Sequence, residues 1–170
     1  MRGARVAPIA FLFAVCAASA LACTCVAFPS AKEAMRGVSV VFRGTAIESK
    51  VLPQHPDMRW RRRYVVTFQV RQFWKGDPKR AVTLYDLEPG SDCTGAGFEA
   101  GHEYLVYAVL REAKDYNLDD VFWFGWTDIL APGTPMLEPV VGCMPGGETS
   151  FRSVRKALRQ LGRGRVPAID

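Results

Sequence analysis

The sequence has few of the residues that carry metal or nucleophilic chemistry. It holds only two histidines, His55 and His102, and neither lies in an H-E-x-x-H motif. No two cysteines have the C-x-x-C spacing, and no Gly-x-Ser-x-Gly turn or phosphate-binding loop is present. Asp115, Asp119 and Asp120 do not form the D-x-D-x-D-G pattern of a calcium loop. We therefore expect no enzyme activity, no cofactor and no metal site of the protein's own.

Long apolar runs are also absent, apart from one near the N-terminus. Residues 9–21 form a run of roughly 13 residues, whereas a membrane-spanning helix needs about 20. Two arginines precede the run, and Ala20 and Ala22 stand at the −3 and −1 positions of an A-x-A cleavage site. We predict a signal peptide over residues 1–22, cleaved after Ala22, and a protein that is secreted, periplasmic or extracellular. A membrane anchor, or lipidation of the cysteine that follows, is the alternative.

Cleavage would leave 148 residues (170 minus 22), and the loss of two arginines would lower the formal net charge from +5 to +3. This length is enough for one domain with its own core. The remaining positive charge is too small to indicate nucleic acid by itself. We expect a monomer that binds no nucleic acid.

Four cysteines remain after cleavage, because Cys16 leaves with the signal peptide. An even number in an exported chain predicts two disulfides. A bond between Cys23 and Cys25 is disfavoured, because so short a loop hardly allows the usual S–S dihedral angle. Cys23 and Cys25 therefore pair with Cys93 and Cys143, in one order or the other. Closing loops of about 70 and 120 residues would contribute about 4 kcal/mol each by the loop-entropy model.

Two helices are predicted, one at each end of the mature chain. Ser30 can cap a short helix within 29–36, which Gly37 ends. A C-terminal amphipathic helix covers about 150–161 and ends at Gly162. Its apolar stripe consists of Phe151, Val154, Leu158 and Leu161. Its outer face consists of Arg152, Arg155, Lys156 and Arg159.

Five strands are predicted between these helices, over 38–47, 64–74, 80–86, 103–110 and 121–127. In the first, Val38, Val40 and Phe42 should share a face, and Gly44 indicates a bulge. Apart from Glu103, the fourth is continuously apolar and should be buried on both faces. The segments 88–101 and 132–139 read as connections, the latter because of its prolines.

These elements favour a mainly β fold, a closed antiparallel five-stranded OB-fold-like Greek-key barrel. An immunoglobulin-like sandwich is the alternative, but it would need about seven strands.

The strongest charge feature is Arg59-Trp60-Arg61-Arg62-Arg63. It could bind a sulfated or acidic polysaccharide, or a membrane surface, with Trp60 adding a stacking face. The basic face of the C-terminal helix could add to this site. The alternative in both cases is a solvated surface.

Several short stretches together resemble the tissue inhibitors of metalloproteinases (TIMPs) and the wider netrin-like (NTR) module. They are Cys-Thr-Cys-Val at 23–26, Val-Phe-Arg-Gly-Thr at 41–45, Phe-Trp-Lys-Gly at 73–76 and Gly-His-Glu-Tyr-Leu-Val-Tyr at 101–107. Cys93 also follows Cys23 by 70 positions (93 minus 23). The resemblance extends from Cys23 to about Gly162, and it implies an OB-like barrel, which we place at 23–165 with a tail over 166–170.

The resemblance further implies a disulfide from Cys23 to Cys93 and another from Cys25 to Cys143. In the inhibitors, the first cysteine chelates the catalytic zinc of a target protease through its α-amino nitrogen and carbonyl oxygen. Carried over, Cys23 is the chelating residue, and the side chain of Thr24 enters the substrate pocket of the protease.

The chain departs from the vertebrate inhibitors in having fewer disulfides and no second domain. The same module also occurs in proteins that inhibit nothing. The alternative function is therefore an NTR-type protein- or polyanion-binding module, in which Cys-x-Cys serves only as two structural staples.

Overall fold

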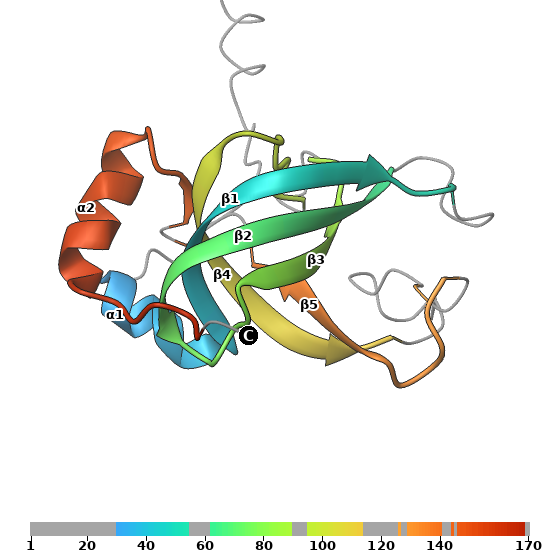
Figure 1. The fold of residues 1–170 in the computed structure, drawn as a ribbon, viewed down its shortest axis with the longest axis horizontal. Helices are drawn as coiled ribbons and strands as arrows, with labels where there is room; N and C mark the ends of the chain where they lie inside the picture. The colour runs from blue at the N-terminus through green and yellow to red at the C-terminus, as the bar shows by residue number, and fades with distance from the viewer. Residues whose placement is uncertain are drawn as a thin grey trace, which may run out of the picture.

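The fold is built around a five-stranded β-barrel, seen in a computed structural model of the protein (Figure 1). The structure describes residues 30–54, 62–89, 95–113, 126, 129–140, 144 and 146–168. The predicted signal peptide and all five cysteines lie outside these residues. In chain order the elements are α1 (Ala31–Ala34), the 3-10 helix η1 (Met35–Gly37), β1 (Val40–Val51), β2 (Arg63–Lys75), β3 (Ala81–Leu87), β4 (Glu103–Glu112), β5 (Pro135–Pro139), β6 (Gly147–Glu148) and α2 (Arg152–Leu161).

The barrel closes in the order β1-β2-β3-β5-β4-β1. β1, β2 and β3 form an antiparallel meander, and β4 pairs antiparallel with both β5 and β1. β3 and β5 pair in parallel at Leu84 and Leu137, so the sheet is mixed. The prediction that all strands would pair antiparallel was therefore wrong for this one pair. A parallel pair needs a long crossover, which the chain between these strands provides. The OB-fold-like Greek-key barrel is confirmed, and the sandwich is excluded.

The inward faces of the strands fill the barrel, since side chains along a strand alternate with a period of two. The strand predicted over 64–74 is confirmed as β2, and its Val66, Phe68 and Val70 alternate into the barrel interior. Phe68 makes edge-to-face contacts with Phe42, at 5.4 Å between ring centroids, and with Phe98, at 5.0 Å. Such aromatic pairs contribute about 0.5–1.5 kcal/mol each beyond their buried area.

A second apolar layer lies outside the barrel wall, where α1 and α2 pack beside β1 and β4 (Figure 1). Leu105 and Tyr107 point into this layer, while Val106 points into the barrel, so β4 is buried on both faces as predicted. Val38 also belongs to the outer layer, together with Val41. The prediction that Val38 shares a face with Phe42 was therefore wrong, because β1 begins only at Val40 and the alternation does not extend back to Val38.

β1 bends at Gly44, which allows it to pair with β2 along its length and with β4 along its first half. The β1–β2 register shifts between Arg43 and Gly44, which confirms the predicted bulge. An ideal Cβ on Gly44 would lie only 2.8 Å from the carbonyl oxygen of Gln69. The bend therefore needs glycine because the two backbones approach so closely.

The fifth barrel strand is Pro135–Pro139, within the stretch predicted to be a connection. The prolines stand at the two ends of β5, and a proline at the start of a strand costs little because its missing N–H is not needed there. The strand predicted over 121–127 lies outside the described residues except for Trp126, which is not in a strand. The reading of 132–139 as a connection was wrong because the strand is short and gains its stability from β4.

The helix ends largely follow the predictions. The Ser30 hydroxyl oxygen accepts a hydrogen bond from the backbone N–H of Glu33 at 3.1 Å, so Ser30 caps α1. α2 ends at Gly162, whose φ of 71° suits glycine. Val154 and Leu161 are buried as predicted, whereas Phe151 is 59% exposed because it precedes α2 as its cap residue. Within the part of the chain that the structure describes, no helix is long and apolar enough to span a membrane.

The chain after α2 returns to β2. The Gly162 carbonyl accepts a hydrogen bond from the Trp74 indole N–H at 3.0 Å. Arg165 and Phe73 exchange two backbone hydrogen bonds of 2.8 Å, and the Arg165 guanidinium lies 4.4 Å from the Phe73 ring centroid. Pro167 is buried, so packing continues to the end of the described residues.

Candidate functional site

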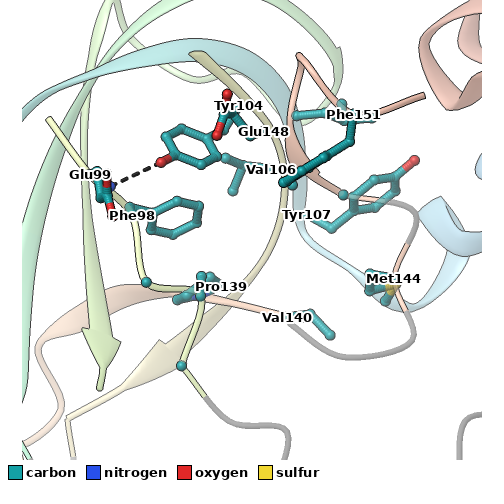
Figure 2. A pocket seen from close by; sticks show the side chains of 16 residues that line it. Phe98, Glu99, Tyr104, Val106, Tyr107, Pro139, Val140, Met144, Glu148 and Phe151 are labelled. Carbon is teal, nitrogen blue, oxygen red and sulfur yellow. Dashed lines mark hydrogen bonds between the residues drawn. The ribbon is translucent and has the colours of Figure 1, made fainter. Parts of the chain in front are cut away.

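A pocket of about 400 Å³ opens beside β4, where that strand changes partner from β6 to β5 (Figure 2). β6 pairs with Tyr104 and Leu105, and β5 pairs only from Ala108 onward. The apolar side chains of the lining are Phe98, Val106, Pro139, Val140, Met144 and Phe151. The volume lies within the range of small-ligand sites. Sequence reasoning did not find this pocket, because its walls come from four separate parts of the chain.

Two tyrosines of β4 hold the pocket walls in place. Figure 2 shows Tyr104 with Phe98 on one side of the pocket and Tyr107 with Met144 on the other. The Tyr104 hydroxyl accepts a hydrogen bond from the Glu99 N–H at 3.0 Å, and the Tyr107 hydroxyl donates one to the Ala31 carbonyl at 3.2 Å. Burial raises the pKa of both phenols. Both therefore stay neutral and position the loop and α1, without serving as bases.

The rim of the pocket carries negative charge. The Ser150 hydroxyl donates to the Glu148 carboxylate and is the main cause that lowers the pKa of that group, with His102 adding to the effect. The His102 ring lies 3.5 Å from Glu148 and 4.0 Å from Glu99. Among the described residues, no group of three His, Cys, Asp or Glu could hold a metal ion. The apolar floor and acidic rim suit an apolar or cationic group.

Asp86 anchors one wall of the pocket from the barrel side. Both carboxylate oxygens accept hydrogen bonds from the backbone N–H of Ala96, at 3.0 and 3.2 Å. The side chain is 3% exposed, and burial raises the pKa of Asp86 to about 6, although backbone hydrogen bonds oppose the rise. The period of two that places Val82 and Leu84 inward also places Asp86 inward. That alternation was the signal that could have singled out Asp86.

Only two residues of the predicted polyanion-binding stretch fall within the described chain. Arg62 is exposed, and its backbone N–H donates to the Glu88 carboxylate at 3.4 Å. Arg63 is fully buried, donates to the Pro53 carbonyl at 2.7 Å and lies 5.6 Å from the Trp126 ring centroid. Arg63 therefore adds no charge to the surface, because Trp126 covers the outer face of β2 at this point. Residues 59–61 lie outside the described chain.

The predicted outer face of the C-terminal helix is confirmed. All four of its basic residues, Arg152, Arg155, Lys156 and Arg159, are exposed on α2. They lie on the side of the helix that faces away from the barrel.

The predicted N-terminal site, Cys23 and Thr24, lies outside the described residues, and so do the other predicted disulfide cysteines. In the sequence, Cys93 stands two residues before Gly95, and Cys143 stands directly before Met144. Gly95 and Met144 both line the pocket. The segments that hold the predicted partners of the N-terminus therefore adjoin the pocket in the chain.

No family model matches the sequence, and a search of curated proteins found no match either.

Proposed function

We propose that the protein is an exported TIMP-like domain of the NTR type, which inhibits a zinc metalloprotease through its mature N-terminal residue, Cys23. The observation that carries this proposal is the A-x-A cleavage site directly before Cys-Thr-Cys-Val. The strand order of the barrel supports it, because the resemblance implies an OB-like barrel of five strands. The function is one of binding, without catalysis.

The chemistry of the N-terminus suits such a role. A catalytic zinc keeps one coordination position open for water or substrate. The α-amino nitrogen and carbonyl oxygen of Cys23 form a bidentate ligand, which would displace the water and make the zinc five-coordinate. A rigid ligand of this kind loses little entropy on binding. The amine must be neutral to coordinate. Since an α-amino group has a pKa of about 7.7–8.0, a useful fraction is neutral at physiological pH.

The described residues support a fixed N-terminus. Ser30, the first described residue, caps α1, and Ala31 and Ala34 are buried in the outer layer. The Tyr107 hydroxyl holds the Ala31 carbonyl beside the pocket. The predicted disulfides would tie Cys23 and Cys25 to Cys93 and Cys143, which stand close in the sequence to the lining residues Gly95 and Met144.

The test begins with the intact mass and N-terminal sequence of the unreduced exported protein. We expect a terminus at Cys23 and a mass lower by four hydrogens than that of the reduced chain. The protein is then assayed on a panel of zinc metalloproteases beside a variant that carries one additional alanine before Cys23. We expect the variant to lose inhibition, because its nitrogen has become an amide that cannot coordinate zinc.

A protein with one additional alanine after Asp170 is the matched control, and it should inhibit like the native form. Equal inhibition by the N-terminally extended variant would overturn the proposal. A blocked or lipidated Cys23, or a free Cys23 that inhibits no protease of the panel, would also overturn it and leave the NTR-type binding module as the function.

A further inference from the structure

The exposed side of α2 carries a single stripe of cations. At 3.6 residues per turn, Arg152, Arg155, Lys156 and Arg159 lie within about 100° of arc. Val154, Ala157 and Leu161, which are buried, lie on the opposite side. We call the four basic residues the α2 cationic stripe. Arg163 and Arg165 follow it and are exposed, and residues 149–168 contain no Asp or Glu.

Within the described residues, no acid is paired with the charges of the stripe. Among the residues that the structure describes, none of the four forms a salt bridge. The guanidinium of Arg155 donates to the Ser150 carbonyl, which carries no net charge. Lys32 of α1 and Arg36 of η1 are also exposed, and the acid between them is Glu33, 3.6 Å from Arg36.

This arrangement does not serve the stability of the helix. α2 has no acidic residue in its first turn and no side-chain cap, and Arg152 occupies its first position, where the helix dipole disfavours a cation. Cations spaced by three and four residues along one face repel one another. Local rules of this kind are commonly broken where a surface has a function.

We propose that the α2 cationic stripe binds a linear anionic polysaccharide that carries carboxylate or sulfate groups. The stripe follows the helix axis over about 10 Å from Arg152 to Arg159 at 1.5 Å per residue, which suits a linear chain of anions. Three of its four members are arginines, whose planar forks bind carboxylate and sulfate through paired hydrogen bonds. This proposal is independent of the Cys23 mechanism.

The packing of α2 favours a polysaccharide over a lipid bilayer. A helix that adsorbs to a membrane buries its apolar face in the interface. The apolar face of α2 is already packed against the barrel wall through Val154, Ala157 and Leu161. The exposed apolar residues Phe151 and Val166 flank the helix and do not lie within the stripe.

The test measures binding of the mature protein to immobilised dextran sulfate and polygalacturonate at increasing NaCl concentration. The triple variant Arg155→Gln, Lys156→Gln, Arg159→Gln should bind at least about tenfold more weakly than the wild type. The slope of log K against log salt is negative, and its magnitude should decrease by about 3 in the variant. Each contact that is lost means that about one counterion fewer is released on binding.

The control neutralises the same number of exposed cations away from α2, as Lys50→Gln, Lys79→Gln, Arg80→Gln. It should keep nearly wild-type binding and slope. Equal losses in both variants would show that only net charge matters and would overturn the proposal. So would a wild type that binds neither polymer, or one that binds only vesicles containing phosphatidylglycerol.

Circular dichroism and thermal unfolding establish that the α2 variant folds. If the α2 variant does not fold, the single charge reversal Arg159→Glu replaces it in the binding assay, with the charge reversal Lys79→Glu as its control. The protein with an alanine before Cys23 should bind both polymers like the wild type. A failure of the protease assay and a failure of the polysaccharide assay can therefore be told apart.

Discussion

At the scale of single residues, Asp86 connects the barrel to the pocket. Its carboxylate lies among buried side chains, yet it is the acceptor that holds the Ala96 N–H in the pocket wall. Desolvation disfavours the charged form and outweighs the hydrogen bonds that favour it, so the pKa rises to about 6. Asp86 is therefore partly protonated in mildly acidic solution.

The stability of the protein should depend on pH through this group. Between about pH 4 and pH 6 the folded protein keeps a proton that the unfolded chain has lost, so the free energy of unfolding falls as the pH rises. A rise of about two pKa units corresponds to about 3 kcal/mol. We expect Asp86→Asn to remove most of this decrease, as measured by urea unfolding at pH 4, 5, 6 and 7.

Asp77→Asn is the matched control, since Asp77 is exposed, and it should keep the wild-type pH profile. Burial also raises the pKa of Glu138, and this group contributes with the same sign in the wild type and in the variant. An Asp86→Asn profile that runs parallel to that of the wild type would contradict this role of Asp86.

At the scale of elements, the bend of β1 decides whether the barrel can close. β1 pairs with β4 only from Val40 to Thr45, whereas it pairs with β2 as far as Val51. Gly44 lies within the segment that has both partners, where the register shifts. The close approach of the Gln69 carbonyl there makes the position sensitive to any added side chain.

Gly44→Ala should lower the free energy of unfolding by about 2 kcal/mol, because the new Cβ must displace backbone atoms. Gly37→Ala is the matched control, since nothing lies within 4 Å of a Cβ there, and it should change stability by less than about 0.5 kcal/mol. Chemical denaturation of the two variants beside the wild type measures both values. Equal stability of the two variants would contradict the account of the bulge.

At the scale of the whole molecule, the barrel is held by backbone pairing around a closed ring. The predicted disulfides would in addition tie the N-terminal segment to the rest of the chain. The barrel interior and the outer layer each contain a large buried apolar cluster within the described residues. The barrel should therefore form without the disulfides, but with lower stability. Reduction of the disulfides would remove the covalent restraint and leave the backbone pairing of the strands in place, so the two contributions to stability can be measured separately.

We expect reduction of both disulfides to lower the free energy of unfolding by about 2–5 kcal/mol while the β-sheet signal in circular dichroism persists at low temperature. Thermal unfolding with and without reductant measures the change. A variant with serine at Cys23, Cys25, Cys93 and Cys143 should match the reduced protein and should not respond to reductant. Identical melting of the oxidised and reduced wild type would contradict the predicted disulfides.

The sequence by itself determined the features that depend on neighbouring residues. Alternation with a period of two located β2 and β3, the apolar run of β4 predicted burial on both faces, and Ser30 and Gly162 set helix ends through local hydrogen bonds and backbone conformation. The predicted number of five strands favoured the barrel, although the fifth strand was predicted over 121–127 and the fifth strand of the barrel is β5. The exposed basic face of α2 was also predicted from the sequence, because the helical period of about 3.6 residues separates it from the buried side.

Only the tertiary structure decided what depends on residues far apart in the chain. β5 has prolines at both ends and is a strand because β4 and β3 pair with it. Arg63 reads as a surface charge but is buried because Trp126, 63 residues later (126 minus 63), packs over it. The pocket exists because four separate segments meet where β4 changes partner. Local patterns carry no information on such meetings, since the free energy that fixes them comes from contacts between distant segments.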